Sequence, residues 1–247
     1  MAIASLRAVP YLGRLSTSNP HCNFFPPARR STVPPVPAHD ARPENDTHRD
    51  LAGILLAPGA GGGAESPAIV ELATSLEVSG LAVGRMDFPY RLAGRRRPDP
   101  PAVLEASVRE RASAFARELG VGTSALVLGG RSMGGRICSQ AVADGLPAAG
   151  LALVSYPLHP PGRPERLRVS HFPMLRVPCL FVSGTKDAFA APPELEAATR
   201  AIPGPVTHVW LEGADHGLRT HARRAADAIL QWLASTFGVP SDRAPQP

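Results

Sequence analysis

The chain has 247 residues, 44% of them hydrophobic and 19% charged, which is ordinary for a soluble globular protein with one sizeable core. Its formal net charge is +5, but Lys186 is the only lysine and the arginines are scattered apart from residues 95–97, which argues against a nucleic-acid-binding surface. No stretch approaches the length of about eighteen apolar residues that a membrane span needs, and the cysteines show no metal-ligand spacing, so we expect a cytoplasmic protein that uses no membrane, metal or cofactor.

Residues 1–48 differ from the rest of the chain. They are rich in Pro, Ser and Arg, contain no acidic residue before Asp40 and show neither helical nor strand periodicity. Such a segment buries too little apolar surface to fold, so we interpret it as a disordered tail or as the product of a wrongly chosen start codon; its composition also resembles an organellar transit peptide. A folded domain is expected at 49–238 and a frayed tail at 239–247.

From Leu51 the sequence alternates between short apolar runs and amphipathic stretches. The apolar runs predict buried strands at residues 53–57, 81–86, 125–128, 150–155, 179–183 and 207–211. The intervening stretches predict helices at residues 66–79, 102–119, 133–144, 193–201 and 220–237. This alternation indicates an α/β fold with an open, mostly parallel, doubly wound sheet. Only residues 156–177 separate the fourth and fifth strands, so a minimal core without a cap domain and an open site are expected.

The pentapeptide Gly130-Arg131-Ser132-Met133-Gly134 follows the third predicted strand and begins a predicted helix. A serine at so tight a strand-to-helix turn needs small residues two positions away on either side, and its hydroxyl is held above the edge of the sheet. The placement therefore predicts a nucleophile elbow with Ser132 as the nucleophile.

A serine nucleophile needs a base and an acid that orients the base, and both are found in the expected order. Asp187 lies directly after the fifth predicted strand, and His216 lies between the last strand and the last helix. The carboxyl ends of parallel strands share one edge of the sheet, so Ser132, Asp187 and His216 are expected to meet there as a catalytic triad.

Other acids and histidines nearby are weaker candidates for these roles. Asp215 adjoins His216, where neighbouring side chains diverge, and Glu194 lies in the helix after Asp187. His208 falls inside a predicted strand and His221 inside a predicted helix, where a structural or solvated role is expected.

Acyl transfer also needs donors for the developing oxyanion. The residue after the nucleophile supplies one, here the N–H of Met133. The glycine-rich loop 58–63 follows the first strand and should supply the other, with Ala60 favoured over Gly59. This loop lacks the lysine of a phosphate-binding P-loop.

Several side chains are placed to contact a substrate. Arg131 lies inside the elbow, Tyr90 follows the second strand, and His159 and His171 lie in the segment after the fourth. The arginines at 91 and 95–97 suggest an anionic or phosphate-bearing substrate such as a coenzyme A thioester, although such charges are more often solvated.

The segments 129–136 (Gly-Gly-Arg-Ser-Met-Gly-Gly-Arg) and 156–162 (Tyr-Pro-Leu-His-Pro-Pro-Gly) carry a family resemblance. The chain resembles the α/β-hydrolase superfamily near its dienelactone-hydrolase-like branch, and more closely a family of small hydrolases that includes testis-expressed-type proteins and a non-catalytic-looking relative from a chromatin-acetylating complex. Two positions depart from these patterns: Pro58 stands where relatives often carry His, and Ser132 where dienelactone hydrolases carry Cys.

The resemblance implies the α/β-hydrolase fold over residues 51–237, the Ser132–Asp187–His216 triad and an esterase-like activity on a small-molecule acyl substrate. The expected reaction is hydrolysis of an ester or thioester through an acyl-enzyme on Ser132. A catalytically inactive interaction protein with this fold, and acyl transfer to an acceptor other than water, remain open alternatives. The sequence leaves open whether the protein is a monomer or a homodimer.

Overall fold

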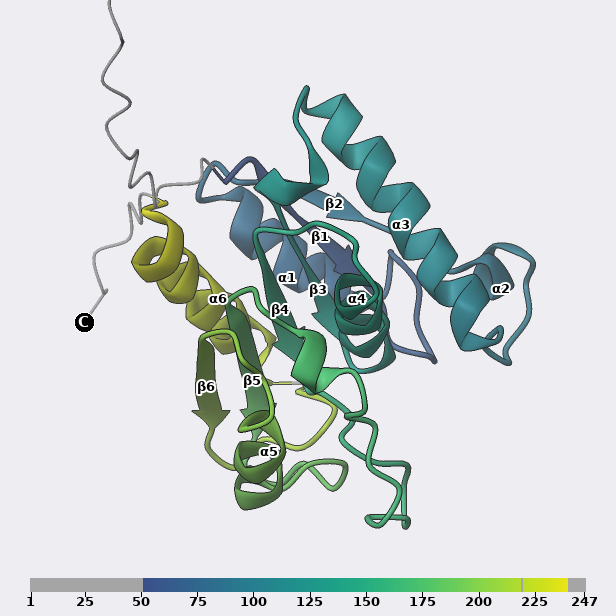
Figure 1. The fold of residues 1–247 in the computed structure, drawn as a ribbon, viewed down its shortest axis with the longest axis vertical. Helices are drawn as coiled ribbons and strands as arrows, with labels where there is room; N and C mark the ends of the chain where they lie inside the picture. The colour runs from purple at the N-terminus through teal and green to yellow at the C-terminus, as the bar shows by residue number, and fades with distance from the viewer. Residues whose placement is uncertain (1–50, 219, 240–247) are drawn as a thin grey trace, which may run out of the picture. The chain divides into compact units, whose positions relative to one another are not determined.

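A computed structural model describes residues 51–218 and 220–239. The interpretations of residues 1–48 and of the tail beyond Val239 fall outside these ranges. The described chain forms one parallel sheet with the strand order β2-β1-β3-β4-β5-β6 (Figure 1). The strands are β1 (Gly53–Ala57), β2 (Ala82–Arg85), β3 (Leu126–Arg131), β4 (Gly150–Val154), β5 (Cys179–Gly184) and β6 (Val206–Leu211).

The helices follow the strands in alternation. They are α1 (Pro67–Glu77), α2 (Pro89–Leu92), α3 (Pro101–Glu118), α4 (Met133–Ala143), α5 (Pro192–Thr199) and α6 (Ala222–Phe237), with short 3-10 turns at η1 (Thr123–Ala125) and η2 (Phe172–Met174). Helices α1, α2, α3 and α5 carry proline in their first turn, where its missing N–H costs no hydrogen bond and its fixed φ suits the helix. All the predicted strands and helices are confirmed, and α2 was missed because four residues are too few to show a helical period.

The two faces of the sheet are covered by different helices, as Figure 1 shows. Successive side chains of a strand point to opposite faces, so Ile54 and Leu56 of β1 pack with α1 and α6, whereas Leu55 packs with α3 and α4. Strands β1, β4 and β5 are buried along their whole length, which explains their uninterrupted apolar runs. The predicted doubly wound sheet is confirmed and proves to be entirely parallel.

Between β4 and β5 the only regular element is η2, so no helical cap domain is inserted in residues 155–178. Cys138 and Cys179 are buried as expected, and burial raises the pKa of each thiol to about 12, which makes them poor nucleophiles. Among the described residues, no helix is long and apolar enough to cross a membrane, and no group of three or more His, Cys, Asp or Glu side chains is arranged to hold a metal ion.

Candidate active site

Ser132 occupies a strained turn between β3 and α4. Its backbone adopts φ 52° and ψ −120°, a region that non-glycine residues rarely populate. The neighbouring glycines make the turn possible, because a Cβ on Gly130 or on Gly134 would overlap the carbonyl oxygen of Ala57 in β1. The sequence therefore needs glycine on both sides of Ser132, and the turn presents the serine at the carboxyl ends of the strands.

The structure brings Ser132, His216 and Asp187 into one line of hydrogen bonds. Ser132 Oγ lies 2.9 Å from His216 Nε2, and His216 Nδ1 lies 2.8 and 3.0 Å from the two carboxylate oxygens of Asp187. The side chain of Asp187 is fully buried and that of His216 is 18% exposed. An ionised carboxylate can only accept, so Nδ1 carries the proton and Nε2 is free to accept the hydroxyl proton of Ser132.

The loop after β5 holds the acid in place. Asp187 Oδ1 accepts a hydrogen bond from the backbone N–H of Phe189 at 2.8 Å, and the exposed Lys186 donates its backbone N–H to Ala214 at 2.9 Å. The ring of Phe189 stacks on His216 with centroids 4.1 Å apart. Sequence reasoning missed Phe189; the only available signal was an aromatic residue two positions after the acid.

Gly59, in the loop expected to supply an oxyanion donor, lies beside Ser132. A Cβ on Gly59 would be 3.6 Å from Ser132 Cβ, so the glycine-rich loop 58–63 passes next to the elbow. The N–H groups of Gly59, Ala60 and Met133 donate to no protein acceptor within the described ranges. The N–H of Gly62 binds the carbonyl of Gly59 at 3.0 Å, and in a trans peptide this turns the N–H of Ala60 the opposite way.

Two of the side chains expected to contact a substrate also support loops of the site. Tyr90 is fully buried, and its hydroxyl donates to the carbonyl of Ala60 in the glycine-rich loop 58–63, the candidate oxyanion loop, at 2.8 Å. His159 is buried against the loop after β5 that carries Asp187, here called the acid loop. Its backbone N–H donates to the carbonyl of Phe189 at 3.3 Å, and its Nε2 lies 3.8 Å from a carboxylate oxygen of Glu194.

Arg131 also makes a structural contact, because its Nη2 donates to the carbonyl oxygen of His216 at 2.8 Å. The arginines at 91 and 95–97 line two surface hollows. One, of about 390 Å³, includes Arg91 and residues 61–66 of the loop that follows Ala60; the other, of about 680 Å³, is lined by residues 95–100. Substrate contact by these arginines remains a prediction.

The weaker candidates have other partners. Asp215 accepts the N–H groups of Gly217 and Leu218 at 2.8 and 3.2 Å, which shapes the turn after His216. Glu194 accepts the N–H of Ala191 at the start of α5, and His208 lies 3.0 Å from the hydroxyl of Thr199. None of these three side chains forms a hydrogen bond with Ser132.

A second serine–histidine pair lies in the interior. Ser139 Oγ of α4 is 2.8 Å from His171 Nε2, but Ser139 is fully buried and its hydroxyl donates to the carbonyl of Arg136 at 2.8 Å. Burial, with a smaller contribution from the charge of Arg136, lowers the pKa of His171 to about 4. The pair joins α4 to the segment between β4 and β5 and presents no hydroxyl to a substrate.

This partly buried histidine is expected to make the fold less stable in acid. Between pH 6.5 and about 4 the unfolded chain binds a proton that native His171 excludes, so the free energy of unfolding falls as the pH falls through that range. Urea unfolding at pH 7 and pH 5 checks this: His171→Gln should lose less stability over the interval than the wild type. An equal loss in both proteins would contradict the assignment to His171.

The chain is similar to known proteins in sequence and in fold. A family model described as an alpha/beta hydrolase domain matches residues 50–236. The chain is similar to an alpha-beta serine hydrolase homologue from Coxiella burnetii, with 21% identity and a TM-score of 0.62 over 74% of this chain and 86% of that one. It is also similar to a putative hydrolase of the alpha/beta superfamily from Xanthomonas campestris, with 24% identity and a TM-score of 0.56 over 74% and 99% of the two chains. A structure of Est1E from Butyrivibrio proteoclasticus with bound ferulic acid shares 16% identity and a TM-score of 0.60 over 76% and 91%. At these identities the solved structures show a shared fold.

Proposed function

The chain belongs to the alpha/beta hydrolase family, and from this membership and the site geometry we propose that it cleaves an ester or thioester through an acyl-enzyme on Ser132. The observation that carries the proposal is the hydrogen-bonded line from Ser132 through His216 to the buried Asp187. A dienelactone-hydrolase-like or testis-expressed-type relationship within the family rests on the segments 129–136 and 156–162 and belongs to the same proposal.

The reaction uses the groups of this line in turn. His216 Nε2 takes the hydroxyl proton as Ser132 Oγ attacks the carbonyl carbon, and the N–H groups of Met133 and Ala60 bind the oxyanion that develops. The tetrahedral adduct collapses, and the proton on Nε2 passes to the departing alcohol or thiol. Water then enters, gives a proton to His216 and attacks the acyl group, so the acid is released and Ser132 regains its proton. Asp187 stays ionised throughout and holds the imidazole in one tautomer.

A fluorophosphonate probe tests the proposal, because it labels only serines that a base activates. We expect the wild type to be labelled and both Ser132→Ala and His216→Ala to be unlabelled. Ser139→Ala is the matched control, since Ser139 also lies 2.8 Å from a histidine but is fully buried, and it should label like the wild type. A folded wild type that does not react would favour an interaction protein with this fold.

A further inference from the structure

One guanidinium group lies where three segments of the site meet. Arg131 precedes Ser132 in the elbow, and its Nη2 donates to the backbone carbonyl oxygen of His216 at 2.8 Å. Its Nη1 faces the oxyanion loop, since a Cβ on Gly59 would lie 3.6 Å from that nitrogen. Arg131 therefore adjoins the proposed nucleophile in sequence, binds the segment that carries the proposed base and lies beside the loop that carries the proposed oxyanion donors.

The contact with His216 has no substitute in the described part of the chain. The carbonyl oxygen of His216 accepts from Arg131 and from no other protein donor there. Without the guanidinium, this carbonyl would lose the one protein donor that the described residues give it, and the bonds from Gly217 and Leu218 to Asp215 would remain in the turn that carries the imidazole.

The charges around Arg131 favour the same arrangement. Burial lowers the pKa of Arg131, and Asp187 and Asp215 oppose this effect by Coulomb attraction to the guanidinium. Arginine stays charged in such surroundings, and its planar fork holds two groups in fixed directions, which a lysine cannot do.

We propose that Arg131 is the positioning residue of this site: it fixes the His216 backbone and the oxyanion loop relative to Ser132. This inference rests on the proposed function, because the distances that Arg131 maintains are those that acyl transfer requires. A displacement of about 1 Å at such a site can cost about 10²-fold in rate.

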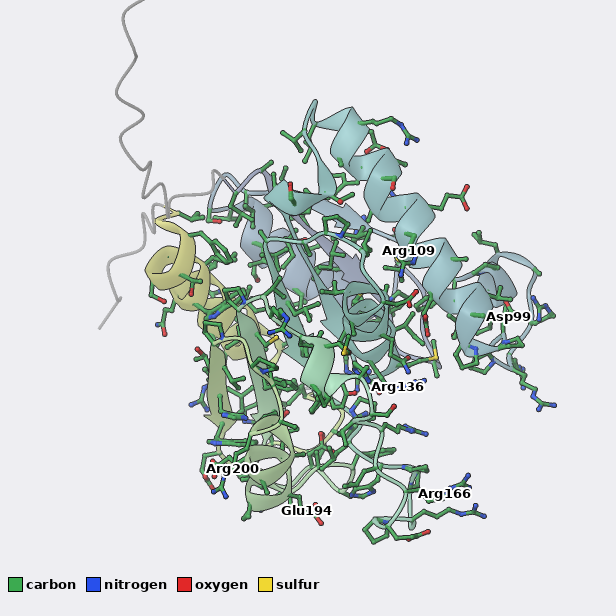
Figure 2. All side chains as sticks on the ribbon, viewed as in Figure 1. Asp99, Arg109, Arg136, Arg166, Glu194 and Arg200 are labelled. Atoms are coloured by element: carbon green, nitrogen blue, oxygen red, sulfur yellow. The ribbon has the colours of Figure 1, made fainter. Side chains whose placement is uncertain are left out.

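Arg136, labelled in Figure 2, offers a matched control on helix α4. Like Arg131 it is partly exposed and has a buried Nε without a protein partner, but its Nη1 binds Gln140 at 2.9 Å within its own helix. Replacement of Arg136 removes the same chemical group from α4 without touching the His216 turn or the oxyanion loop.

The first experiment measures kcat and KM for a short-chain ester. Arg131→Met should lower kcat by about 10- to 100-fold with KM within about twofold, Arg131→Lys should recover only part of the loss, and added guanidinium ion should restore turnover of Arg131→Met. Arg136→Met should keep kcat within about threefold of the wild type. A kcat of Arg131→Met close to that of the wild type, beside an inactive Ser132→Ala, would overturn the positioning role and leave the proposed function intact.

A second measurement needs no turnover. The proton that His216 Nδ1 donates to Asp187 at 2.8 Å should give a strongly downfield proton resonance in the wild type and in Arg136→Met. In Arg131→Met this resonance should move upfield or broaden through exchange with water. An unchanged resonance would overturn the inference; its loss in a protein with no measurable hydrolysis would support the positioning role and count against the proposed function.

Discussion

Turnover of a short-chain ester is expected to fall by about 10³-fold or more when Ser132 is replaced by alanine, because the variant lacks the hydroxyl held 2.9 Å from His216 Nε2. In free energy this is a loss of about 4 kcal/mol of transition-state stabilisation. Initial-rate measurement of kcat/KM for the wild type and the variant checks it. Retention of most activity by Ser132→Ala would rule out Ser132 as the nucleophile.

Ser132→Gly separates this loss from unfolding. The serine is held at φ 52°, a backbone conformation that costs of order 1 kcal/mol or more in a residue with a side chain and little in glycine. We therefore expect Ser132→Gly to be inactive and yet to unfold at a higher urea concentration than Ser132→Ala. A lower midpoint for the glycine variant would show that the turn is not strained at Ser132.

Gly134→Ala is expected to cost about 3 kcal/mol of folding free energy, or about 6–12 °C in melting temperature. The added Cβ would overlap the carbonyl oxygen of Ala57 and lie 2.6 Å from the carbonyl oxygen of Pro58. Both are backbone atoms of the segment that leads from β1 into the oxyanion loop, so neither can move away cheaply. Thermal unfolding followed by circular dichroism measures the shift.

Gly61→Ala, in the loop that follows β1, is the matched control. A Cβ on Gly61 would meet no atom within 4 Å, and its φ is not positive, so its stability should change by less than about 0.5 kcal/mol. If Gly134→Ala lost as little folding free energy as Gly61→Ala, the elbow would relax around the added Cβ, and glycine at 134 would not be required by packing.

The sheet and the line of three side chains could be predicted because each depends on a local pattern. The strands β1, β4 and β5 are buried on both faces, so their sequences are continuous apolar runs. Asp187 and His216 each follow a strand directly, and a parallel sheet brings such positions to one edge. β3 was predicted to end at 128 but continues to Arg131, because the pattern was lost at two glycines that the elbow needs for packing.

The supporting contacts could not be predicted because they join residues that are distant in sequence and have no characteristic spacing. Tyr90 binds Ala60 across 30 positions and Arg131 binds His216 across 85. The sequence shows that these side chains lie near the site, but only the folded chain shows that both hold backbone carbonyls. Phe189 was missed for the same reason, since its stacking on His216 depends on how two loops meet.

Lys186 directly precedes Asp187, is exposed and is the single lysine of the sequence. A protease that cleaves after lysine therefore has one cleavage site. Cleavage there would separate residues 1–186 from 187–247 and so divide Ser132 from Asp187 and His216. The rate of this cleavage reports how often the peptide bond between Lys186 and Asp187 becomes accessible to the protease. A covalent inhibitor on Ser132 that restrains the loop after β5 would slow the cleavage. The chain thus carries its own reporter of motion in the acid loop, which can be read on a gel without any label.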